Sequence, residues 1–126
     1  MAQPKPAQVN NVKASIERGR KMYNQICLSC HMADGGGAPH LNPPLIQTEY
    51  VLGDKSRLIQ IVLKGMKEKL VIDDEAYSNI MAPHNYLTDQ QIADVLTYIR
   101  NNFGNKVSAV TLAEVKAARN TGKQKK

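Results

Sequence analysis

The chain has 126 residues, a length that suits one domain, and it carries a formal net charge of +6. No stretch approaches the roughly 18 to 20 apolar residues of a membrane-spanning helix, and residues 1–6 lack the apolar run of a signal peptide. The basic residues are scattered and no recognition motif accompanies them, so nucleic-acid binding is not expected. There is no Trp and a single Phe, so the core would gain from an apolar group other than a side chain.

The first half of the chain predicts one helix followed by a long loop. Residues 1–10 are expected to form a flexible leader, and the helix is expected to begin near Val12 and to run as far as Cys30. Its apolar residues recur at helical spacing on one face: Val12, Ile16, Tyr23 and Ile26. Gly19 falls on the same face, where it would let another helix approach closely. Residues 33–54 are rich in Gly and Pro, which predicts a loop.

Three further helices are predicted in the second half. One spans about residues 55–64 and is ended by Gly65. Residues 66–87 are expected to be irregular, with at most a short extended segment over 69–72 and no strand pattern long enough for a sheet. Thr88 and Gln91 match a capping box at the start of the third helix, which is expected to continue through Phe103 to Gly104. A fourth short helix is predicted from Thr111, with Glu114 completing a second capping box, to about residue 119.

These elements predict an all-α protein with one domain. The domain is expected to occupy residues 11–105, followed by an extension with a short helix over 106–120 and a basic tail over 121–126. The basic residues near this end of the chain, from Lys116 onward, suit either a solvated terminus or a docking surface for an acidic partner.

The motif Cys27-Leu28-Ser29-Cys30-His31 carries the chemistry of this sequence. A Cys-x-x-Cys-His motif is typical of covalent haem attachment. The two thiols lie about one helical turn apart, so each can add to one vinyl group of a porphyrin, and His31 is then carried under the iron as a ligand.

Three other interpretations of the motif are weaker. A thioredoxin-like pair would be expected near a βαβ pattern, which the sequence lacks. A structural zinc site needs four ligands, and the motif supplies three at most. A disulfide between the two cysteines would close a very small loop and stabilise little.

If the attached haem serves to carry electrons, its iron needs a second axial ligand besides His31. The sequence offers several candidates: Met22, Met32, Met66, Met81, His40 and His84. Met22 and Met32 are too near the attachment motif to reach the other haem face. Met81 is preferred because it precedes the last long helix in a segment that can wrap over that face, and Met66 and His84 remain open alternatives. A neutral thioether favours ferrous iron and raises the reduction potential.

From about Gly19 to Gly104 the sequence resembles the bacterial class I monohaem cytochromes c. Residues 19–27 resemble the first helix of that family and residues 87–100 its last helix. These two helices cross in the family, which would place Gly19 and Tyr23 against Leu96 and Tyr98. The resemblance implies a cytochrome c fold of about four helices around one covalently bound haem c with its iron.

The resemblance also implies roles for residues between these helices. Asn42-Pro43-Pro44-Leu45 resembles the segment on the proximal side, in which the carbonyl of Pro44 would accept a hydrogen bond from the His31 ring. Residues 48–52 resemble a stretch whose Tyr contacts a haem propionate, which implies that role for Tyr50, with Arg57 as a second candidate. Many members have Pro directly after the ligand Met, whereas here Ala82 precedes Pro83.

The function implied is electron transfer by one haem c that cycles between Fe(II) and Fe(III), with His31 and Met81 as axial ligands. Residues 107–119 resemble extensions of cytochrome domains attached to periplasmic oxidoreductases, such as nitrite reductases and quinoprotein dehydrogenases. The expected protein is a monomeric carrier rather than an enzyme, located in the periplasm or elsewhere outside the cytoplasm, whose partner is an oxidoreductase, oxidase or dehydrogenase. The alternatives are a haem enzyme or sensor of small gases or peroxide with a displaceable sixth ligand, and a thiol oxidoreductase or small metal site without haem.

Overall fold

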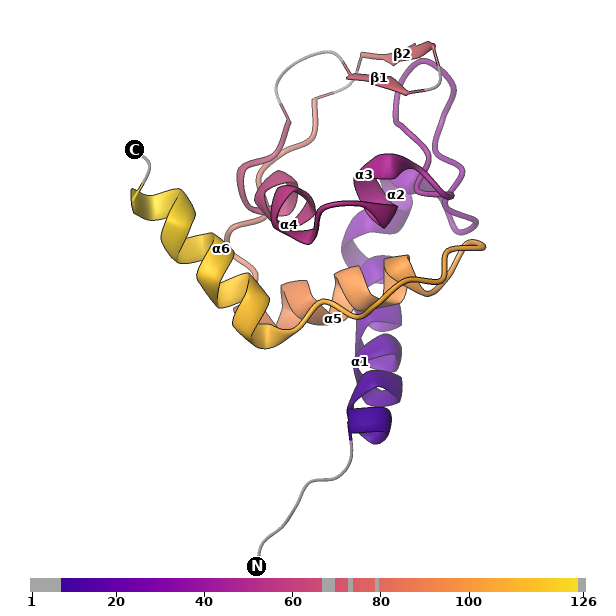
Figure 1. The fold of residues 1–126 in the computed structure, drawn as a ribbon. Coiled ribbons are helices and arrows are strands. Elements are labelled where there is room, and N and C mark those ends of the chain that lie inside the picture. Colours follow the sequence, from indigo (N-terminus) through magenta and orange to yellow (C-terminus); the bar gives the residue numbers. More distant parts are fainter. Residues whose placement is uncertain (1–7, 67–69, 73, 79, 125–126) are drawn as a thin grey trace, which may run out of the picture.

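The computed structural model describes residues 8–66, 70–72, 74–78 and 80–124. Its helical elements, in chain order, are α1 (Gln8–Met22), the π-helical segment η1 (Tyr23–Cys27), α2 (Leu28–His31), α3 (Glu49–Leu52), α4 (Lys55–Lys64), α5 (Asp89–Arg100) and α6 (Leu112–Gln124). A two-stranded antiparallel hairpin, β1 (Leu70–Ile72) and β2 (Glu75–Tyr77), lies between α4 and α5. Figure 1 shows α1 crossing α5 at one end of the molecule and the hairpin at the other. The predicted all-α class is confirmed.

The crossing of α1 and α5 depends on Gly19. A Cβ atom at this position would overlap the backbone carbonyl oxygen of Asp94, and its next neighbour would be Tyr98. The prediction that Gly19 permits a close helix crossing is therefore confirmed, with Asp94 and Tyr98 rather than Leu96 as its nearest neighbours. The buried carboxylate of Asp94 fastens the crossing, because it accepts hydrogen bonds from Ser15 at 2.6 Å and from Arg18 at 2.7 Å.

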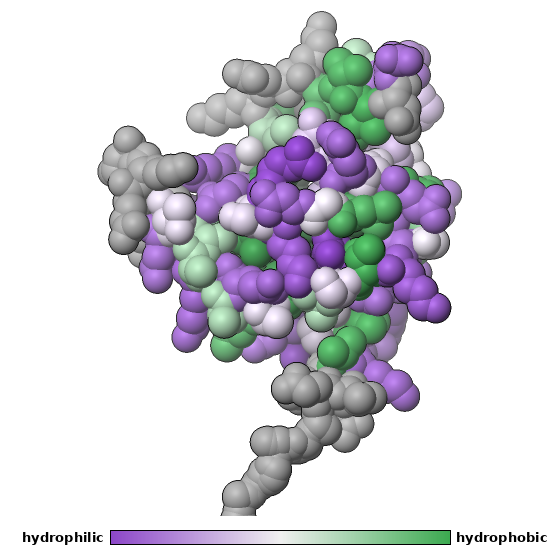
Figure 2. Space-filling view, in the orientation of Figure 1, coloured by the Kyte–Doolittle hydropathy of each residue, from purple (hydrophilic) through white to green (hydrophobic). Residues whose placement is uncertain are grey.

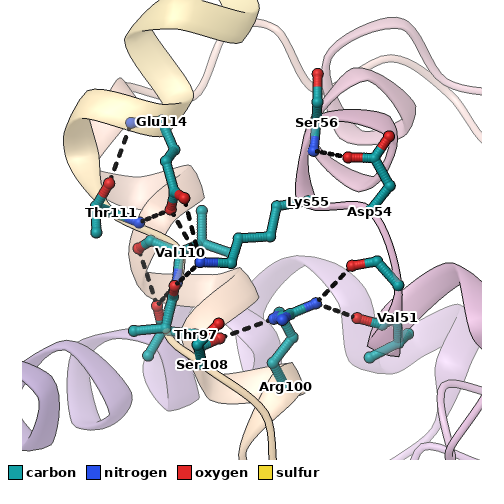
Figure 3. A network of polar contacts seen from close by, with 12 residues as sticks. Val51, Asp54, Lys55, Ser56, Thr97, Arg100, Ser108, Val110, Thr111 and Glu114 are labelled. Atoms are coloured by element: carbon teal, nitrogen blue, oxygen red, sulfur yellow. Dashed lines mark hydrogen bonds and ion pairs between the residues drawn. The ribbon is translucent and has the colours of Figure 1, made fainter.

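Helix α6 packs against α4 and α5 and is held by polar contacts at its start (Figure 3). Lys55 Nζ donates to the Ala109 carbonyl at 2.8 Å and pairs with Glu114 Oε2 at 3.1 Å. The buried Arg100 donates to the carbonyls of Ser108 at 2.9 Å and Val51 at 2.6 Å, so one side chain joins three segments. The extension after α5 is thus part of the packed domain.

Most predicted helix boundaries agree with the structure. α4 spans the predicted residues, and Gly65 ends it with φ of 76°. The capping box of Thr88 and Gln91 is present at the start of α5. The second capping box is confirmed as well, because Thr111 and Glu114 exchange side-chain to backbone hydrogen bonds at 2.8 and 3.1 Å.

Other boundaries were predicted wrongly. α1 begins at Gln8 rather than near Val12, and residues 1–7 of the expected leader lie outside the described residues. α5 ends at Arg100 because Phe103 adopts a left-handed φ of 56° and folds its ring back to 5.3 Å from that of Tyr23. α6 continues to Gln124, into the expected basic tail.

Two elements fall where the sequence predicted irregular chain. α3 forms because Thr48 caps it, accepting a hydrogen bond from Val51 N at 3.3 Å. The hairpin pairs Leu70 with Tyr77 and Ile72 with Glu75. Residues 70–72 are extended as predicted, Lys69 lies outside the described residues, and the partner strand β2 was not expected. None of the helices in the described residues is long and apolar enough to cross a membrane.

Candidate haem site

The attachment motif lies at a change of helix type. Cys27 ends the π-helical segment η1, and Cys30 and His31 follow in α2. π-Helical turns inside helices are frequent at functional sites. Both cysteines line the same cavity, and they are not joined to each other in a disulfide. Burial, with a smaller contribution from Cys30, raises the pKa of the Cys27 thiol to about 11, so this group stays protonated at neutral pH.

His31 is oriented by a backbone carbonyl, although not by the one predicted. Its Nδ1 lies 2.9 Å from the carbonyl oxygen of Pro43, so the assignment of this bond to Pro44 was wrong by one residue. Neighbouring carbonyls of an extended stretch point in different directions, so Pro43 and Pro44 cannot both face the ring. Gly37 leaves room for this loop, because a Cβ there would overlap the carbonyl oxygens of Asn42 and Pro43. Pro44 instead lines the cavity.

The imidazole of His31 is prepared to act as a neutral ligand. Burial holds its pKa below the usual value, the Pro43 carbonyl opposes that shift, and the nearby His84 adds to it. When Nδ1–H donates to Pro43, Nε2 keeps its lone pair available for a metal.

A cavity of about 310 Å³ opens beside the motif. Its walls come from the end of α1, from η1, α2, α3, α4, α5, the hairpin and the connecting loops, and most of the wall residues are apolar. They include Ile26, Leu45, Val51, Leu58, Val62, Ile72, Leu96 and Ile99. Two thiols and an imidazole on a mostly apolar wall fit a porphyrin that is bonded through sulfur and ligated from one face.

Three of the candidate distal donors reach this cavity from the segment between α4 and α5: Met66, Met81 and His84. Met66 and Met81 form an antiparallel bridge, with N to O distances of 2.9 and 3.0 Å. Gly65 permits this pairing, because a Cβ there would overlap the Met81 carbonyl oxygen. The backbone N of His84 donates to the Val62 carbonyl at 2.8 Å, which fixes the segment onto α4.

The other candidates lie less favourably. Met22 lines the cavity on the attachment side, whereas Met32 is 40% exposed and its carbonyl accepts a hydrogen bond from Tyr23. His40 has an exposed side chain whose Nδ1 lies 2.9 Å from Glu75 Oε2.

Tyr50 and Arg57 come together as a stacked pair. The guanidinium carbon of Arg57 lies 4.4 Å from the centroid of the Tyr50 ring, and Arg57 Nη2 donates to the Glu49 carbonyl at 3.2 Å. Tyr50 lines the cavity, and Arg57 lies behind it.

The sequence reasoning missed several wall residues. Thr48 is buried at the cavity, and Leu70, Ile72 and Tyr77 bring the hairpin onto it. A sequence signal for the hairpin existed, because two short runs, Leu70–Ile72 and Glu75–Tyr77, flank two consecutive Asp residues, a residue type that favours turns.

Residues 16–103, which contain the motif and most of the cavity wall, match the sequence model of the family described as cytochrome c. The chain belongs to the cytochrome c family. This cytochrome c is 33% identical over 91 residues to cytochrome c-552 of Thermus thermophilus, a match that covers 69% of each chain.

Two further relatives are subunits of larger dehydrogenases. This cytochrome c is 35% identical over 108 residues to the cytochrome c subunit of the quinone alcohol dehydrogenase of Gluconacetobacter polyoxogenes. It is 29% identical over 120 residues to the fructose dehydrogenase cytochrome subunit of Gluconobacter japonicus. These matches cover 82% and 91% of this chain but only 23% and 24% of the relatives, so the chain spans about a quarter of their length.

Family membership settles the cofactor and the general function. The protein carries a covalently bound haem c with its iron and transfers electrons. The alternative of a haem enzyme or sensor is not favoured, and a haem-free thiol or metal module is excluded by the same membership.

Proposed function

We propose that this cytochrome c carries electrons through a haem bonded to Cys27 and Cys30, with His31 and Met81 as its axial ligands. The observation that carries the proposal is the convergence on one apolar cavity of two thiols, an imidazole oriented by Pro43, and Met81 from a separate segment. When bound, the haem supplies an iron that takes up and releases one electron.

Each protein group has a distinct task in this scheme. Pro43 holds the His31 ring and favours the tautomer in which Nε2 is unprotonated. Met81 supplies a neutral sulfur, which favours the ferrous state and closes the sixth position to oxygen and peroxide. The apolar walls exclude water, and Pro44 belongs to these walls rather than to the His31 contact.

Tyr50 is proposed to hold a haem propionate through its hydroxyl group. Its support is that Tyr50 lines the cavity while its ring is fixed from behind by Arg57 at 4.4 Å. The cation also places positive charge near the phenol, which suits an anionic group. Arg57 therefore supports Tyr50 in this proposal.

The partner is proposed to be a dehydrogenase, with this chain as a monomeric carrier that has no catalytic activity of its own and is located outside the cytoplasm. Support comes from the relatives, which are named as cytochrome subunits of alcohol and fructose dehydrogenases. The surface offers a place to dock. Ile80 lines the cavity and is 69% exposed, and Figure 2 shows apolar side chains gathered at the end of the molecule that carries the hairpin.

Mass and absorption spectra of the protein, expressed together with haem-attachment machinery, test the proposal. The intact mass should exceed that of the polypeptide by one haem, and the ferric form should show the weak long-wavelength charge-transfer band that thioether ligation gives, here called the thioether band. The ferrous form should have a sharp low-spin α-band and should bind CO slowly. A covalent haem without the thioether band would refute the axial assignment, and rapid CO binding would favour a sensor or enzyme.

A further inference from the structure

A second thioether lies beside Met81 in the cavity wall. Met66 and Met81 are far apart in sequence, yet each donates its backbone N–H to the carbonyl of the other, at 2.9 and 3.0 Å. Residues that exchange both hydrogen bonds across an antiparallel pair carry their side chains on the same face. Both methionines accordingly line the cavity.

The backbone of Met66 is held by the same contacts that hold Met81. Gly65 ends α4 with φ of 76° and leaves space for the Met81 carbonyl, so the residue after it starts from a fixed helix end. The Val62 carbonyl, in the last turn of α4, accepts the His84 N–H at 2.8 Å. Met66 therefore occupies a defined place at the distal wall of the site.

The chemistry of the two side chains is identical. A methionine side chain has three rotatable bonds and adapts to irregular space, so a sulfur next to the ligand position can move onto it. Both donors are neutral, so replacement of an iron–sulfur bond to Met81 by one to Met66 would move no proton and no electron.

We propose that Met66 is a reserve distal ligand, which takes the sixth iron position when the Met81 thioether is lost. The inference rests on the proposed ligation by Met81. It gives this chain a way to keep a closed, thioether-ligated haem after damage to the principal ligand.

His84 is the competing donor, since it also lines the cavity and its Nδ1 is buried without a hydrogen-bond partner among the described residues. The two replacements have different signatures. Ligation by His84 would keep a low-spin haem without the thioether band, whereas ligation by Met66 would retain that band.

Three variants test the proposal: Met81→Leu, Met66→Leu and the double variant. Leu preserves most of the volume of Met, so the cavity walls should persist. We expect the ferric thioether band in the wild type, in Met66→Leu and in Met81→Leu, and its loss only in the double variant. In the ferrous proteins, NMR of methionines labelled in the methyl group should show one methyl strongly shifted by the haem, belonging to Met81 in the wild type and to Met66 in Met81→Leu.

Each other result has a definite meaning. Loss of the band in Met81→Leu, whether the haem becomes high-spin or is ligated by His84, would overturn the proposal. So would failure of both Met81→Leu and Met81→Ala to accumulate as haem proteins when Met66→Leu does. A wild type without the band would instead refute the underlying axial assignment, and loss of the band in Met66→Leu alone would make Met66 the principal ligand.

Discussion

The two walls of the cavity obtain their donors in opposite ways. On the proximal side, Cys27, Cys30 and His31 lie in five consecutive residues of one helical segment, so local helix geometry places them together. On the proposed distal side, the candidate donors Met66, Met81 and His84 come from irregular chain, which is positioned by contacts with α4 and by one antiparallel bridge. This comparison predicts that a donor is removed from the proximal wall only by substitution of that donor itself. On the distal wall, substitution of a supporting residue should also move a donor out of place.

The largest effect is expected from breaking the proximal wall. In Cys27→Ser/Cys30→Ser no thiol remains for addition to the haem vinyl groups, so the intact mass should fall to that of the bare polypeptide. Ser29→Ala, which changes the exposed residue between the cysteines, is the control and should keep the haem. Covalent haem in the double variant would contradict the assignment of the attachment site.

Gly65 supports the distal wall by leaving space for the Met81 carbonyl, and a substitution there should remove this support. Gly65→Ala forces a side chain into left-handed backbone and into the Met81 carbonyl. Gly104→Ala is the matched control, because Gly104 has φ of 80° but its Cβ would meet only the end of the Gln47 side chain at 3.4 Å. We expect Gly65→Ala to lower the free energy of unfolding by about 1–3 kcal/mol more than Gly104→Ala does.

The two glycine variants should also differ in their spectra. Chemical denaturation of the ferric protein gives the free energies, and under the proposed ligation the thioether band reports the position of Met81. The band should weaken in Gly65→Ala and persist in Gly104→Ala. Equal losses of stability, with the band intact in both, would show that the pairing with Met81 does not depend on Gly65.

The same contrast explains how far the sequence could predict the fold. α4, with its Asp54 cap and its Gly65 end, and the start of α5, with its capping box, were predicted correctly because short-range contacts determine them. The end of α5 was not, because Phe103 leaves the helix to pack its ring against Tyr23 and Tyr98 at 5.3 and 5.8 Å. Such long-range packing has no signature in helical spacing.

For the site, the attachment motif could be recognised from five residues, whereas its supports could not. The bond from His31 to Pro43 depends on how the loop folds at Gly37, whereas the family resemblance implied Pro44. The choice among Met66, Met81 and His84 remained open because the structure brings all three to the cavity. The bridge between Met66 and Met81 could be seen only in three dimensions.

A smaller effect is expected where α6 supports the distal segment. Arg119 donates to the Asp89 carboxylate at 2.7 Å and to the carbonyls of Leu87 at 2.8 Å and Asn85 at 3.1 Å, directly after His84. Arg119→Ala should lower the free energy of unfolding by about 1–2 kcal/mol. On heating, the thioether band of this variant should disappear at a lower temperature, its bleaching temperature, than in the wild type. Lys116→Ala, at an exposed position of the same helix, should change neither quantity. A normal bleaching temperature in Arg119→Ala would mean that the distal segment does not need α6.

The smallest effect is expected from the contact between the loop that leads to Pro43, on the proximal side, and the segment with Glu75 and Ser78, on the other side. His40, in the loop that leads to Pro43, accepts hydrogen bonds through its carbonyl from Ser78 N at 3.0 Å and Ser78 Oγ at 3.1 Å, and its ring pairs with Glu75 at 2.9 Å. The side chains of His40 and Glu75 are 76% and 38% exposed, so water and salt screen the pair.

Glu75→Gln should therefore lower the free energy of unfolding by no more than about 0.5 kcal/mol. Gln keeps a side-chain oxygen that can accept a hydrogen bond from the His40 ring, and concentrated salt should reduce whatever difference from wild type the lost negative charge causes. Glu17→Gln, which breaks an exposed ion pair with Arg20 on α1, is the control for removing a surface carboxylate far from the cavity. If imidazole binds to the ferric haem of Glu75→Gln several-fold faster than to that of Glu17→Gln, the contact between the walls restrains Met81. Equal rates would show that each wall holds its own ligand independently.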